Sequence, residues 1–122
     1  MADTMQGLKR THYCGEVLPS LIGETVVVTG WVQKTRDLGN LVFIDLRDRT
    51  GIVQLAFNDG TQREIFEKAA AARAEFVLMA KGLVRRRESV NTEIPTGEVE
   101  VYVDDLRVLA KSQTPPFEIV ND

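Results

Sequence analysis

The sequence predicts an all-β fold, a small five-stranded Greek-key barrel with one α-helix between its third and fourth strands. Runs in which apolar residues alternate with polar ones recur along the chain, as in strands with one buried face. Glycines interrupt two of the longer runs, which is typical of strands that bend around a barrel. The chain has 122 residues, of which 43% are hydrophobic, enough for one domain with its own core.

The first three strands are expected before residue 58. Val26–Val32 alternates in strand fashion, and Gly30 within it indicates a bend or bulge. Leu41–Arg47 and Ile52–Phe57 flank the turn-rich link at residues 48–51 and predict a hairpin.

The parity of this hairpin separates a core face from an outer face. Every second residue of each strand is apolar, and these residues predict the core face: Val42, Ile44, Leu46, Val53, Leu55 and Phe57. Phe43 and Gln54 fall on the other face, and a link with an even number of residues would place them directly opposite each other. An aromatic ring beside an amide on an outer sheet face suits a flat polar ligand such as a nucleobase.

The second half of the chain predicts the helix and the last two strands. Thr61 and Glu64 have capping-box spacing, and the apolar stripe after them predicts a helix of about 12 residues that plugs one end of the sheet. Glu75–Arg87 predicts a strand with an interior glycine, and residues 88–97 a loop. Residues 98–109 predict the fifth strand, with a bulge at Asp104-Asp105.

This order of elements is that of the OB-fold, which binds oligonucleotides on the face of its second and third strands. We expect residues 1–10 to be a flexible tail and residues 11–110 to form the domain. Residues 111–122 contain two adjacent prolines and are expected to be a linker that leaves the domain.

The charge balance argues against a general nucleic-acid coat protein. The net charge is −3 and the pI about 5.2, so bulk positive charge cannot supply affinity. The basic residues are nevertheless segregated into two clusters: Lys34, Arg36, Arg47 and Arg49, and then Arg85–Arg87. A specific binder with a local positive surface remains compatible with this pattern.

Other features concern the compartment and possible metals. No apolar run approaches the roughly 20 residues of a membrane span, and the N-terminus lacks a signal-peptide core. The single Cys14 excludes an internal disulfide and favours a reducing, cytoplasmic setting, and one histidine argues against a Cys/His metal site.

Binding is better supported than catalysis. The sequence has no phosphate loop and no nucleophile elbow, and Asp45 and Asp48 are expected to be structural. Phe43 can stack on a base, and Gln54 can donate to and accept from the edge of uracil. Glu100 accepts only, which suits the N–H edge of guanine.

The arginines would complete such a site. Arg36, Arg85 and Arg87 can hold phosphates or further base edges. Arg86 lies on the opposite strand face from Arg85 and Arg87, and is expected to be surface.

Longer motifs point to one family. The run THYCGEVLPSLIGETVVVTGWVQKTRDLGNLVFIDLRDRTGIVQL and the later PTGEVEV resemble the N-terminal anticodon-binding domain of bacterial-type aspartyl-tRNA synthetase, over about residues 11–122. The GWV, RDxG, FIDLRD and GIVQ elements are shared with the lysyl and asparaginyl relatives. The leading THYCG and the spacing from Gly30 to Gln54 favour the aspartyl enzyme.

The resemblance implies an anticodon site made of seven residues: Arg36, Phe43, Gln54, Arg85, Arg87, Asn91 and Glu100. Phe43 would stack on the middle base, a uracil, which Gln54 would hydrogen-bond with Arg36 beside it. Glu100 would read the first base, a guanine. The remaining residues would contact the neighbouring bases and the backbone.

The resemblance also implies a larger parent enzyme of class II. That parent would use ATP and magnesium to charge tRNA with aspartate, as a cytoplasmic homodimer. This chain would be a monomer without a cofactor or a membrane contact, and residues 111–122 would lead toward the catalytic domain. The alternatives are the anticodon domain of an asparaginyl or lysyl relative, a generic single-strand-binding OB-fold protein, or a protein-interaction module.

Overall fold

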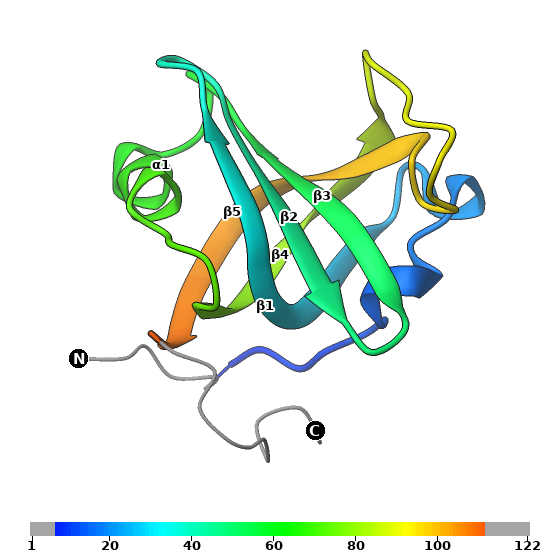
Figure 1. Cartoon of the computed structure of the whole chain (residues 1–122), viewed down its shortest axis with the longest axis horizontal. Coiled ribbons are helices and arrows are strands. Elements are labelled where there is room, and N and C mark those ends of the chain that lie inside the picture. Colours follow the sequence, from blue (N-terminus) through cyan, green and yellow to red (C-terminus); the bar gives the residue numbers. More distant parts are fainter. Residues whose placement is uncertain (1–6, 112–122) are drawn as a thin grey trace.

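The computed structural model describes residues 7–111 and confirms the predicted barrel (Figure 1). Five strands close into a barrel in the order β1-β2-β3-β5-β4. Their bounds are β1 Thr25–Asp37, β2 Val42–Asp48, β3 Gly51–Phe57, β4 Val77–Arg86 and β5 Val99–Ala110. The helix α1 spans Arg63–Ala70, and two 3₁₀ turns, η1 Cys14–Glu16 and η2 Pro19–Leu21, precede β1. Most of the expected tail and linker lies outside the described residues.

The core lies inside the barrel and follows the predicted parity. Val42, Ile44 and Leu46 of β2 are fully buried, as are the alternating apolar residues of β3. Because successive side chains of a strand point to opposite faces, Phe43 and Gln54 lie on the outer face.

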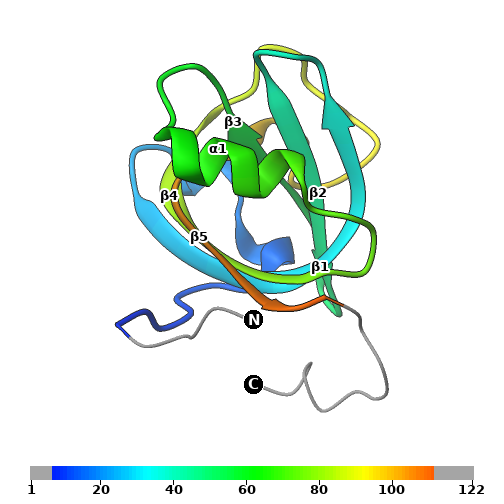
Figure 2. The ribbon, with the colours of Figure 1, turned by 90° about the vertical axis from the view of Figure 1, so that its left-hand side faces the viewer.

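Helix α1 covers one opening of the barrel, in front of which it lies in Figure 2. Ile65, Phe66 and Ala69 pack against the core. The helix has 8 residues rather than about 12, and the predicted capping box is wrong. Thr61 Oγ1 accepts a hydrogen bond from the Asn58 amide (3.0 Å), so the hydroxyl closes the preceding turn and Gln62 becomes the N-cap. No helix among residues 7–111 is long and apolar enough to cross a bilayer.

The register of the hairpin differs from the prediction. Asp48 pairs with Gly51, so residues 49 and 50 form the turn. A direct pair between Phe43 and Gln54 would need the turn one residue earlier. Phe43 instead pairs with Ala56, and Gln54 is its diagonal neighbour on the same face.

Strand β1 pairs with two neighbouring strands of the barrel. Its first half pairs with β4 and its second half with β2, and Trp31 pairs with both. The bulge lies between Val32 and Lys34 rather than at Gly30. Gly30 is required for a different reason, because a Cβ atom there would lie 2.3 Å from the carbonyl oxygen of Arg47. The predicted bulge in β5 is confirmed, since the register with β4 skips Asp104.

The segment before β1 is held under the β2–β3 turn by Asp48, whose side chain is 7% exposed. Its carboxylate accepts from the amide of Cys14 (2.8 Å) and from the amide and hydroxyl of Thr50 (2.8 and 2.6 Å). Cys14 and Val17 are thereby buried in the core. Asp48 has a structural role, as expected.

The Cys14 thiol gives a pH-dependent stability. Burial, with the Asp48 carboxylate beside it, raises the pKa of this thiol above its ordinary value of 9.0. The folded chain keeps a proton that the unfolded chain loses, so the thiol's contribution to stability is present below pH 9 and is lost as the pH rises above it. We expect the free energy of unfolding, measured with urea from pH 8 to 10, to fall more steeply for the native chain than for Cys14→Ala, by up to about 1.4 kcal/mol per pH unit. Parallel curves for the two proteins would contradict this.

Candidate nucleic-acid interface

The outer face of the barrel carries two rows of side chains that run across all five strands. The register pairs of neighbouring strands define the first row: Lys34, Asp45, Gln54, Glu100 and Arg85. The adjacent row is Arg36, Phe43, Ala56, Tyr102 and Leu83. Closure of the barrel between β3 and β5 is what brings Gln54 beside Glu100.

An open groove of about 520 Å³ lies over these rows. Six of the seven predicted site residues line it: Arg36, Phe43, Gln54, Arg85, Arg87 and Glu100. Asn91 is not among the lining residues. Its Oδ1 accepts from the amide of Glu93 (2.9 Å), which places it in the turn of the 88–97 loop.

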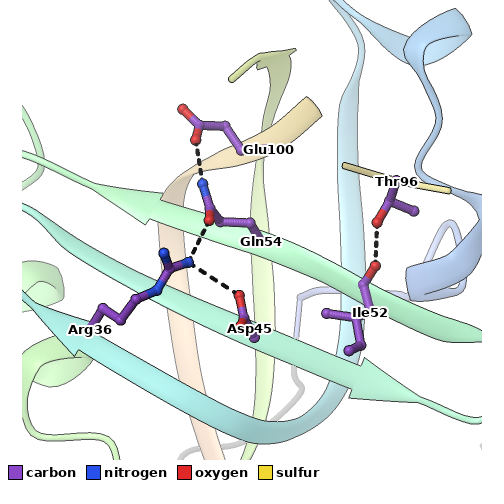
Figure 3. A network of polar contacts seen from close by, with 6 residues as sticks. All are labelled: Arg36, Asp45, Ile52, Gln54, Thr96 and Glu100. Atoms are coloured by element: carbon purple, nitrogen blue, oxygen red, sulfur yellow. Dashed lines mark hydrogen bonds and ion pairs between the residues drawn. The ribbon is translucent and has the colours of Figure 1, made fainter. Parts of the chain in front are cut away.

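A chain of polar contacts forms the floor of the groove (Figure 3). Arg36 donates to Gln54 Oε1 (2.7 Å), and Gln54 Nε2 donates to Glu100 Oε1 (2.8 Å). The side chain of Arg85, which Figure 3 does not draw, donates from Nε to Glu100 Oε2 (2.8 Å). Gln54 and Glu100 are 4% and 6% exposed, so each of these buried polar groups is satisfied by the other and by one arginine.

Two arginines also lie over aromatic rings of the second row. The Arg36 guanidinium is 5.4 Å from the centre of the Phe43 ring, and that of Arg85 is 4.2 Å from the centre of the Tyr102 ring. The Tyr102 hydroxyl donates to Asn58 Oδ1 (2.8 Å), which fixes this ring in place. The sequence analysis assigned no role to Tyr102.

The other members of the arginine cluster differ in their surroundings. Arg87 has a buried Nε for which the described residues provide no hydrogen-bond partner. Arg86 is mostly exposed and forms a 3.8 Å ion pair with Glu98. Arg86, which was expected to be surface, also lines the groove and is the last residue of β4.

The loop before β5 is tied to the same sheet. Thr96 donates its hydroxyl hydrogen to the carbonyl oxygen of Ile52 on β3, as Figure 3 also shows. This bond holds the start of β5 against β3 next to the Gln54–Glu100 pair. Residues 7–111 contain no group of three or more His, Cys, Asp or Glu side chains that could hold a metal ion.

Known proteins resemble this chain in sequence and in structure. A family model named tRNA anti-codon, and described as an OB-fold nucleic acid binding domain, matches residues 26–109. The chain belongs to this family. All strands of this OB-fold domain except the ends of β1 and β5 lie within the matched residues. The predicted fold and family are therefore confirmed.

Relatives similar to this OB-fold domain include two curated ligases and one solved synthetase. It is 54% identical over 121 residues to the aspartate–tRNA(Asp/Asn) ligase of Caldanaerobacter subterraneus subsp. tengcongensis, covering 98% of this chain and 20% of that protein. It is 53% identical over 115 residues to the aspartate–tRNA ligase of Limosilactobacillus fermentum, covering 94% and 20%. The solved asparaginyl-tRNA synthetase of Pyrococcus horikoshii is 36% identical with a TM-score of 0.71, covering 88% and 24%. The chain thus spans about a fifth of the curated relatives it matches.

Proposed function

We propose that this chain is the anticodon-reading domain of an aspartate–tRNA ligase, and that it binds an anticodon with guanine first and uracil in the middle. The observation that carries the proposal is a continuous series of hydrogen bonds, which links Arg36, Gln54, Glu100 and Arg85. It lies beside Phe43 on the floor of one groove. This arrangement combines a stacking ring with groups that can read a base edge.

Each side chain has a distinct task in the proposal. Phe43 stacks on the middle base, while Gln54 bonds its edge and Arg36 lies beside it. Glu100 accepts hydrogen bonds from the first base, because guanine presents N–H donors along its Watson–Crick edge. Three residues at the rim and in the nearby loop serve the phosphates and neighbouring bases: Arg85, Arg87 and Asn91.

The rest of the proposal concerns the longer enzyme. Relatives of this chain are named aspartate–tRNA ligases. The longer enzyme would join aspartate to tRNA with ATP and magnesium, as a homodimer in the cytoplasm. This chain would supply tRNA recognition and no ligand to the nucleotide or the metal ion, and would itself be monomeric without a membrane contact.

Titration with two anticodon stem-loops tests the proposal. The 122-residue chain is expected to bind a loop carrying GUC more tightly than one carrying GCC, by about 1–3 kcal/mol, because cytosine presents its donor and acceptor to Gln54 in the reverse order of uracil. Fluorescence anisotropy at one fixed salt concentration measures both affinities. Equal binding of the two loops would identify a single-strand binder without preference, and binding of neither would favour a protein-interaction module.

A further inference from the structure

The side-chain amide of Gln54 has an orientation that its neighbours impose. An arginine carries only donors and a carboxylate only acceptors. Arg36 therefore requires the oxygen of the amide at 2.7 Å, and Glu100 requires the nitrogen at 2.8 Å. A rotation of the amide by 180° would set two donors against each other on one side and two acceptors on the other.

Both neighbours have further partners of their own. Arg36 lies 3.5 Å from Asp45 Oδ1. Glu100 is paired with Arg85, whose guanidinium stacks over the Tyr102 ring. Since Gln54 and Glu100 are almost fully buried, water has little access to compensate a reversed amide.

A locked amide presents a defined order of groups to a ligand. Beyond its two bonds in the structure, Gln54 keeps one acceptor position on Oε1 and one hydrogen on Nε2. Uracil offers a donor at N3 and an acceptor at O4, whereas cytosine offers an acceptor at N3 and a donor at N4. Two bonds to uracil and two bonds to cytosine at the same place therefore need opposite amide orientations.

We infer that Arg36 and Glu100 are positioning residues that set the preference for uracil over cytosine at the middle base, by fixing the orientation of the Gln54 amide. This inference rests on the proposed function and deepens it. The amide alone can read either pyrimidine, and its two charged neighbours make it read one.

The two neighbours act redundantly, and this gives a distinctive test. In the Arg36→Gln variant, the carboxylate of Glu100 can still pair only with the nitrogen of the Gln54 amide. In the Glu100→Gln variant, the guanidinium of Arg36 can still pair only with the oxygen of that amide. Glutamine can both donate and accept, so only the double variant R36Q/E100Q frees the amide to rotate. The GUC-over-GCC affinity ratio is the readout, because lost phosphate or first-base contacts weaken both loops alike.

We expect each single variant to keep most of the wild-type ratio. In the double variant the ratio should fall by about tenfold beyond the product of the two single effects, a factor within the range of discrimination that one bidentate pair provides. A double variant whose ratio equals the product of the singles would overturn the inference and leave the proposed function standing. A wild-type chain that does not discriminate would overturn both.

A measurement without variants guards against a misfolded double variant. In NMR spectra of the wild-type chain bound to the GUC loop, one side-chain amide proton of Gln54 should show contacts to the Glu100 side chain, as in the free chain. Loss of those contacts on binding, with the amide reversed, would contradict the inference that the orientation of the Gln54 amide is fixed.

Discussion

Replacing Phe43 with alanine is expected to weaken binding of the GUC stem-loop by about 1–3 kcal/mol, the usual contribution of one aromatic platform under a base. The free energy of unfolding should change little, because the ring lies on the outer face of β2 and outside the core. Anisotropy titration and urea unfolding of the same samples separate the two effects.

Phe57 provides the matched control for this experiment. It is an aromatic of the neighbouring strand β3, but its side chain is fully buried. Phe57→Ala should lower the free energy of unfolding by about 3–5 kcal/mol, since it leaves a cavity in the core. A Phe43 variant that loses stability on that scale would show that the ring supports the core rather than a ligand.

Replacing Asp48 with alanine is expected to lower the free energy of unfolding by about 3 kcal/mol. The substitution leaves the buried Cys14 amide and the Thr50 amide without their acceptor, and it frees the segment that carries Cys14 and Val17. Urea unfolding near pH 7 measures the change.

Asp45→Ala is the control on the same strand. The Asp45 side chain is 25% exposed, and its contact with Arg36 is a long ion pair at 3.5 Å. Such partly exposed pairs contribute about 0–1 kcal/mol, so this variant should remain close to wild type in stability. Equal losses from the two aspartates would contradict the structural role assigned to Asp48.

The faces of the strands were predictable from the sequence, but the register was not. Alternation assigns Ile44 to the core and Phe43 to the outer face, and these assignments are confirmed. A shift of two residues preserves every face, so alternation cannot locate the partner of Phe43. The turn at residues 49 and 50 fixes the register. There the Asp48 carboxylate accepts hydrogen bonds from the amide and the hydroxyl of Thr50.

The capping box was predicted wrongly for a similar local reason. Thr61 and Glu64 satisfy the spacing of a capping box, yet the Thr61 hydroxyl bonds the Asn58 amide in the preceding turn. Serine and threonine hydroxyls bond turns as readily as helix ends, and spacing alone does not distinguish the two.

The sequence predicts the candidate site as a set of residues but not as a network of contacts. The sequence singled out Gln54 and Glu100 separately, and the structure joins them across 46 positions of sequence. No local pattern encodes that contact, because it depends on how β3 meets β5. Tyr102 was missed for the same reason, since its value lies in supporting Arg85.

The β3–β5 pairing that closes the barrel has a dynamic consequence. It is a parallel ladder that covers only Gln54–Ala56 against Glu100–Tyr102, whereas β4 and β5 pair along nearly their whole length. Local opening of a fold begins where the fewest hydrogen bonds must break, so we expect the barrel to open first between β3 and β5. A ligand that contacts both Gln54 and Glu100 would stabilise the pairing of β3 with β5. Binding in the groove would therefore make local opening of the barrel rarer.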